Sequence, residues 1–307
     1  MTQLKLTEKK AGSHGVKPNP YAFMALLLGA VGIAFAPIFV RLSELGPSAT
    51  AFYRLGFAAP LLGLWLWTSL PTSPPLSPRQ RVNLFPLMSA GCFFAADLAV
   101  WHWSIQFTSV ANATLLANFA PIFVVLAGWL LFGQTVSRWF VAALALVLSG
   151  ATLLVSASID TQHLFGDALG LLTAIFYAGY ILSVARLRLY FSTAIIAFAS
   201  STVGATILFF VAWLSGESFL PVTTIGWLSL VGLACISQVI GQSLIMFALA
   251  HLPSAFASVS LLLQPVTAAI LAWRLFGEAL TLQQGLGGVI VLAGIVLARW
   301  SDRKLVS

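Results

Sequence analysis

The stretch GWLLFGQ at 128–134 returns as AWRLFGE at 272–278, an offset of 144 residues. The same register, without a gap, matches Pro121 with Pro265 and Leu148 with Leu292. Coincidences are common among Leu, Ala and Val. A proline, a tryptophan and a Phe-Gly pair shared in one register are much harder to obtain by chance. The chain is therefore expected to consist of two homologous halves.

Composition places both halves in a membrane. Of the 307 residues, 60% are hydrophobic and 7% are charged, whereas a soluble domain carries about 25% charged residues. Only lipid accommodates such a surface. We expect an all-α integral membrane protein whose ten transmembrane helices each cross a hydrocarbon layer of ~30 Å. The expected spans are 21–42, 48–69, 84–106, 109–132, 138–157, 166–186, 191–214, 224–249, 253–276 and 281–300.

The distribution of basic residues predicts the orientation. With the N-terminus inside, most Lys and Arg fall on the cytosolic side, only Arg41 and Arg274 fall outside, and Arg54 lies within a span. Because this follows the positive-inside rule, the net charge of +7 reflects orientation, and no nucleic-acid partner is expected. An even number of spans places both tails, 1–20 and 301–307, in the cytosol.

Five spans in each half is an odd number, so the two halves must enter the membrane from opposite faces. The expected units are a first five-helix repeat at 21–157 and a second at 166–300. Inverted repeats are a common plan of secondary transporters, whose solute site lies between them. Alternating access follows when the halves exchange conformations.

Three stretches carry a resemblance to a known family: TSVANATLLANFAPIFVVLAGWLLFGQ at 108–134, LPSAFASVSLLLQPVTAAILAWRLFGE at 252–278 and FYRLGFAAPLL at 52–62. The chain resembles the drug/metabolite transporter (DMT) superfamily, EamA type, over most of its length. The resemblance implies secondary transport, often export of amino acids or similar small metabolites, here across a bacterial inner membrane. The nearest subgroup is the YddG-like aromatic amino-acid exporters. Likeness of fold alone does not identify the solute.

Asp97 is the most informative single residue, near the middle of the third span. An intramembrane carboxylate costs about 2.5–3.5 kcal/mol on insertion scales, so it should face protein or water. It would bind a substrate ammonium or a coupled proton; the alternative is a structural bond to a neighbouring helix. Trp101, one turn later on the same face, belongs either to the site or to the interfacial belt. His102 is expected to be a satisfied polar group that reaches water at the helix end; the alternative is a proton relay.

Arg54 is the other charge within a span. It is expected to snorkel to the outer interface or to pair with a fixed partner such as Glu44. The alternative is a clamp for a substrate carboxylate, which guanidinium geometry suits.

Uncharged polar residues within the spans complete the predicted substrate site: Asn112, Asn118, Tyr177, Tyr180, Gln238, Gln242, Ser260 and Gln264. Amides and phenols suit a zwitterionic or aromatic solute, and they equally suit bonding between helices. Pro121 and Pro265 lie at matching positions in the middle of their spans. They are expected to act as hinges in two bent helices that line the pathway.

The sequence contains no metal-ligand cluster, nucleotide-binding loop or hydrolase motif, so we predict neither an enzyme nor a metal or cofactor. One alternative is a sugar-phosphate or nucleotide-sugar exchanger, which would need several cations at the midplane. Another is a membrane-embedded lipid-modifying enzyme, which would need convergent acid, base or metal groups. Four glycines imply close packing, either within the chain or in a homodimer: Gly285, Gly287, Gly288 and Gly294.

Overall fold

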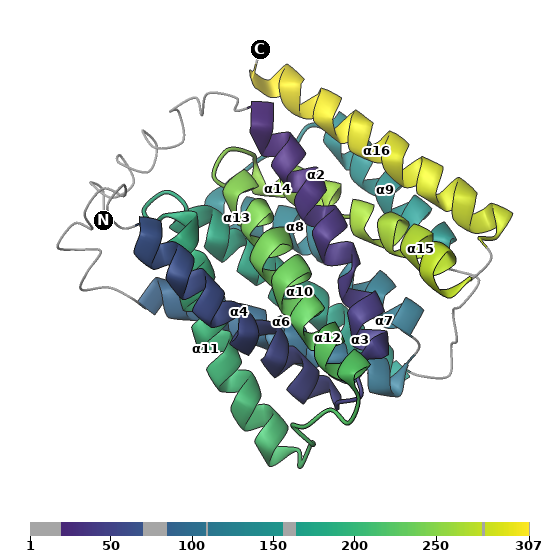
Figure 1. Ribbon diagram of the computed structural model, residues 1–307. Coiled ribbons are helices and arrows are strands. Elements are labelled where there is room, and N and C mark those ends of the chain that lie inside the picture. The colour runs from purple at the N-terminus through teal and green to yellow at the C-terminus, as the bar shows by residue number, and fades with distance from the viewer. Residues whose placement is uncertain (1–19, 70–84, 109, 156–163, 278–279, 307) are drawn as a thin grey trace.

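A computed structural model describes residues 20–69, 85–108, 110–155, 164–277 and 280–306 (Figure 1). Every regular element in these ranges is a helix. Eight helical segments are long and apolar enough to cross a membrane: Tyr21–Leu42, Pro47–Ser69, Ala113–Leu131, Leu164–Leu187, Thr193–Leu214, Thr224–Ala248, Ser254–Phe276 and Leu282–Ser301. The expected all-α integral membrane class is confirmed for the described residues.

Three of these segments are interrupted. The first consists of α2 (Pro20–Ala34) and α3 (Ala36–Leu42), another of α7 (Val110–Ala117) and α8 (Ala120–Phe132), and a third of α14 (Ser254–Ser260) and α15 (Leu263–Phe276). In each case a proline stands in the first turn of the second piece, namely Pro37, Pro121 and Pro265. Proline has no N–H to donate and clashes with the preceding turn, so the helix before it ends.

A fourth segment changes its winding instead of breaking. It runs from α12 (Thr224–Gly232) through the π-helical η3 (Leu233–Gln242) into α13 (Ser243–Ala248). Long π-helical stretches are rare, and π turns occur frequently at functional sites.

Six helices have no such break: α4 (Pro47–Ser69), α6 (Phe85–Phe107), α9 (Arg138–Val155), α10 (Leu164–Leu187), α11 (Thr193–Leu214) and α16 (Leu282–Val306). Two of them, α6 and α9, are not among the eight apolar segments. Helix α6 carries several polar residues, among them Asp97, His102 and Gln106, and the apolar part of α9 is short.

Helices from the two halves of the chain are interlaced. The first helix of each half packs against the third of the other, since α2 contacts η3 and α13 while α10 contacts α6. Equivalent helices also pair directly, with α4 along α11 and α9 along α16 (Figure 1). Each of these contacts made by a helix of one half is therefore matched by a contact of the equivalent helix of the other half. The two halves pack into one body and do not form separate ones.

Small residues allow the closest of these contacts. A Cβ atom added to Gly287 of α16 would lie 2.6 Å from the backbone nitrogen of Leu154 on α9, and one on Gly150 would lie 2.8 Å from that of Val291. A Cβ on Gly285 would meet no described atom within 4 Å. Gly287 therefore serves a contact within the chain.

At one end of the bundle, each half caps the other with a glutamate. The Glu44 carboxylate, which follows α3, accepts hydrogen bonds from the backbone nitrogens of Val222 and Thr223 at 2.7 and 3.1 Å and from the Thr223 hydroxyl. Glu217, which follows α11, accepts from the backbone nitrogens of Ser48 and Ala49 at 3.1 and 2.8 Å. The side-chain and backbone hydrogen bonds from Thr223 lower the pKa of Glu44 below its usual value.

Candidate functional site: a polar cavity at the helix breaks

A cavity of about 110 Å³ lies where the interrupted helices meet. Pro37, Asn118 and Pro265, which belong to the three breaks, all line it. A single water needs roughly 10–15 Å³ on this scale, so the cavity has room for a small solute. Breaks in membrane helices are tolerated where the freed backbone faces protein or a cavity.

Most of the predicted site residues line this cavity. They are Asp97, Trp101, Asn118, Tyr177, Gln242, Gln264 and the hinge residue Pro265. They come from α6, α10 and α15, from the end of η3 and from the break after α7. The local spacing on α6 explains part of the result, because Phe94, Asp97 and Trp101 recur at helical intervals on one face.

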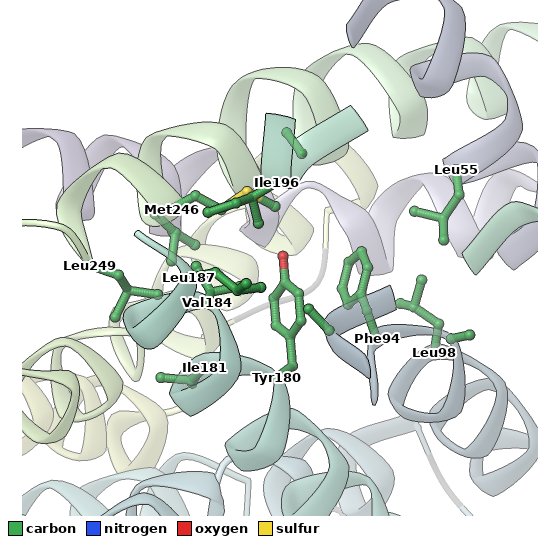
Figure 2. Packing of buried hydrophobic residues seen from close by; sticks show 14 of the residues in the cluster. Leu55, Phe94, Leu98, Tyr180, Ile181, Val184, Leu187, Ile196, Met246 and Leu249 are labelled. Carbon is green, nitrogen blue, oxygen red and sulfur yellow. The ribbon is translucent and has the colours of Figure 1, made fainter. Parts of the chain in front are cut away.

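Two predicted residues lie in a second layer behind the cavity lining. Tyr180 is fully buried, stacks on Phe94 with ring centroids 4.5 Å apart (Figure 2), and accepts a hydrogen bond from Gln242 Nε2 at 3.1 Å. Gln238 Oε1 accepts a hydrogen bond from Arg54 Nε at 3.1 Å. Both residues therefore contact side chains of the cavity wall without lining it.

The remaining predicted residues lie elsewhere. The Ser260 hydroxyl donates to the Phe256 carbonyl at 2.9 Å, inside its own helix. Pro121 is buried at the start of α8. The side chain of Asn112 lies outside the described residues.

The cavity holds one cation and one carboxylate. Arg54 is 4% exposed and Asp97 is 8% exposed, and both line the cavity. Within the described residues, Asp97 makes no hydrogen bond and no ion pair with Arg54. The guanidinium lies 5.7 Å from the centre of the Phe94 ring. A bound solute can therefore approach both charges.

Arg54 has a fixed partner, which was one of the two expectations, but that partner is Gln238 and not Glu44, and the buried side chain does not snorkel to the interface. The expectation for His102 is wrong. His102 does not reach water at the helix end: it is 1% exposed, and its Nδ1 donates to the Leu98 carbonyl at 2.7 Å. Among the residues that the structure describes, its Nε2 atom has no hydrogen-bond partner. Packing by distant segments covers both residues.

Within the described residues, three buried polar atoms of the lining have no hydrogen-bond partner of good geometry, although the Gln264 side chain lies near the Tyr177 hydroxyl: Thr114 Oγ1, Gln242 Oε1 and Gln264 Nε2. Leaving such a group unsatisfied costs about 1–3 kcal/mol. The set contains an acceptor, a donor and a hydroxyl that can act as either. These atoms therefore point to polar groups of a ligand or to water.

The predicted site omitted several lining residues, including Pro37, Phe94 and Thr173. A signal existed for Pro37, since it interrupts an apolar run as Pro121 and Pro265 do. No signal existed for Thr173, because a threonine in a membrane helix most often bonds to its own backbone, as Thr173 does to the Leu169 carbonyl.

An interlaced helical bundle in a membrane, with a polar cavity at its helix breaks, has the architecture of a solute transporter. The model of the EamA-like transporter family matches the chain twice, at residues 20–156 and 164–300. The protein belongs to this family, and the family indicates a membrane transporter rather than an enzyme.

Named relatives agree with this assignment. An uncharacterized transporter of Archaeoglobus fulgidus is 26% identical over 273 residues, which cover 86% of this chain and 91% of the relative. The pseudopaline exporter CntI of Pseudomonas aeruginosa is 27% identical over 224 residues, 72% of this chain and 76% of the exporter. A crystal structure with 17% identity covers 93% of this chain and 99% of its own with a TM-score of 0.75, which supports the fold.

Proposed function

We propose that the protein is a secondary transporter that moves amino acids, including aromatic ones, or similar small zwitterionic metabolites. The observation that carries the proposal is the placement of Arg54 and Asp97 in one buried cavity without an ion pair between them. A carboxylate binds an ammonium group, and a guanidinium binds a carboxylate through paired hydrogen bonds. A zwitterion offers both groups within a few ångströms.

The neutral lining suits the rest of such a solute. Trp101, Tyr177 and Phe94 provide aromatic walls, against which an aromatic or apolar side chain packs well. The unsatisfied atoms of Gln242 and Gln264 offer one acceptor and one donor. Solute binding would satisfy these atoms and offset part of the cost of leaving water.

The proposed topology has ten transmembrane helices in two inverted five-helix repeats, 21–157 and 166–300. In it, α6 and α9 supply the two spans that are too polar or too short to be recognised by hydropathy. Both termini are cytoplasmic, in a bacterial plasma membrane. Pro121 and Pro265 act as paired hinges, and rocking of the interlaced halves opens the cavity to each side in turn. Export is the proposed direction, as in the relative named an exporter.

A phosphate-bearing solute fits the cavity less well. A sugar phosphate carries about two negative charges, and the lining residues include one arginine, no lysine and one aspartate. The aspartate would repel the phosphate at close range. We therefore rank a sugar-phosphate or nucleotide-sugar exchanger below the zwitterion transporter.

Counterflow in proteoliposomes that contain only the purified protein tests the proposal. Liposomes loaded with unlabelled phenylalanine should accumulate labelled phenylalanine. The methyl ester, which lacks the carboxylate, and the N-acetyl form, which lacks the ammonium, should each compete at least about 10-fold more weakly, as expected when one partner of a charged hydrogen bond is lost.

Exchange of no amino acid in a panel of neutral, acidic and basic ones, combined with exchange of a sugar phosphate, would reject the zwitterion proposal and favour the phosphate exchanger. Protein-free liposomes provide the baseline.

A further inference from the structure

A second cavity, of about 430 Å³, lies between α8 and α10, away from the polar one. We call it the lateral groove. Its walls include Leu126, Leu130 and Leu131 of α8 and Leu182 of α10, and its lining also includes Phe93 of α6. Leu130 and Leu131 are 63% and 71% exposed, so the groove opens toward the surroundings of the bundle.

The groove is apolar along most of its length and basic at one end. Its lining on α10 runs from Ile175 through Ala178 and Leu182 to Ser183 and Arg186, close to the end of the helix at Leu187. The α-helix rises roughly 16 Å between Ile175 and Arg186, which is close to half of a hydrocarbon layer of ~30 Å. The groove therefore has the length of one lipid leaflet, with a cation near the level of the headgroups.

We propose that the lateral groove binds an anionic phospholipid, with one acyl chain along the leucines and the phosphate at Arg186. The charge at the rim argues for this occupant: Arg186 is exposed, and a guanidinium offers several donors in a fork that fits phosphate oxygens. Basic positions between membrane helices at the ends of spans bind acidic lipid headgroups in this way. The Ser183 hydroxyl adds a polar group near the same end.

The position of the lipid connects it to the polar cavity. Helix α10 lines the polar cavity through Thr173 and Tyr177 and lines the groove through Ala178 and Leu182. Helix α8, the other wall, begins at the Pro121 break. A lipid in the groove therefore packs on another face of α10, which lines the solute site, and on α8, which follows the helix break that places Asn118 in the cavity wall. The proposal requires only that the chain is embedded in a membrane, and it does not depend on which solute is carried.

Native mass spectrometry of the purified full chain tests the proposal, with equimolar phosphatidylglycerol and phosphatidylcholine of identical acyl chains as probes. Wild-type protein should retain phosphatidylglycerol over phosphatidylcholine by about 5-fold, as expected for one arginine near an anionic headgroup. Arg186→Gln should reduce that preference to about 1. Arg138→Gln, which removes an exposed arginine at the start of α9, should leave it unchanged.

A second pair of variants tests the acyl-chain site. Ser183→Phe fills the groove and should lower retention of both lipids, whereas Ser149→Phe, an exposed position on α9, should not. If Ser183→Phe is not monodisperse in size exclusion, Ala127→Leu provides a smaller obstruction of the same groove.

Equal retention of the two lipids by the wild type, or an unchanged preference in Arg186→Gln, would overturn the proposal. So would a lipid-free dimer that Ser183→Phe dissociates, because a second copy of the chain would then occupy the groove.

Discussion

The two halves of the chain share a packing scheme but contribute different chemistry to the cavity. Both charged lining residues, Arg54 and Asp97, come from the first half. The second half supplies uncharged polar groups, among them Tyr177, Gln242 and Gln264. The contacts between helices, in contrast, are reproduced when the halves are exchanged. The helix packing is therefore symmetric between the halves, whereas the proposed solute-binding side chains are not.

The first helices of the two halves show the same divergence. In the first half this span is broken between α2 and α3, and Pro37 at the break lines the cavity. In the second half, α10 is continuous and reaches the cavity with the side chains of Thr173 and Tyr177. At the cavity, the first helix of the first half therefore contributes a helix break, and the first helix of the second half contributes polar side chains.

The largest expected effect comes from removing the charge that only the first half supplies. Asp97→Asn preserves shape and should lower zwitterion counterflow on the order of 10- to 100-fold, because a hydrogen bond to a charged group is lost. It should also abolish the discrimination against the N-acetyl analogue. Asp167→Asn, a carboxylate bonded to Thr108 at the start of α10 and outside the cavity, should retain exchange. Wild-type kinetics in Asp97→Asn would show that the charge asymmetry has no role in transport.

The second largest effect is expected on stability, from substitutions at the contact between the equivalent helices α9 and α16. Gly287→Ala places a methyl group against backbone atoms of Leu154 and should destabilise the protein by about 1–3 kcal/mol, a typical cost of overpacking. Gly285→Ala, two residues earlier with open space around it, should be neutral or stabilising by up to about 1 kcal/mol. Thermal unfolding in detergent compares the two. Equal melting temperatures for the two variants would mean that α9 and α16 can move apart to accept the added methyl group at little cost.

A smaller effect separates two polar residues of the second half that sequence reasoning treated alike. Gln264→Leu removes an unsatisfied donor from the cavity and should raise the KM for a zwitterion about 5-fold, the value of one neutral hydrogen bond. Ser260→Ala should change it little, because that hydroxyl already bonds within α14. A larger effect at Ser260 than at Gln264 would reverse the assignment.

The smallest effect is expected at Glu44, one of the two glutamates that accept backbone hydrogen bonds from the other half of the chain. Because hydrogen bonds from Thr223 lower the pKa of Glu44 from a usual 4.5, the ionised group stabilises the fold above that pH. This contribution is lost as the pH falls through the lowered pKa. Glu44→Gln should therefore melt slightly below wild type at pH 7, and the two should converge in strong acid. A difference that persists there would indicate that shape, not charge, matters at this cap.

The sequence predicts what depends on local spacing. Asp97 and Trp101 share a face of one helix, and a helix ends just before a proline in the sequence. The shared face and the helix breaks at Pro121 and Pro265 were therefore predictable. The partner of Arg54 was not, because Gln238 lies 184 residues away on a π-helical segment that no local pattern indicates. The burial of His102 likewise depends on the packing of distant helices. The hydrophobic composition that identified the membrane class says nothing about which helices meet.

The interlacing has a consequence for how the chain is made. The Ser237 hydroxyl donates to the Gly32 carbonyl at 3.1 Å, across a separation of 205 residues. At roughly 5–20 residues per second, a ribosome needs about 10–40 s to produce that much chain. During that interval α2 sits in lipid without its final neighbours. The closing steps of biogenesis must therefore await the late helices, and a chain that stalls midway would leave its earliest helix unassembled.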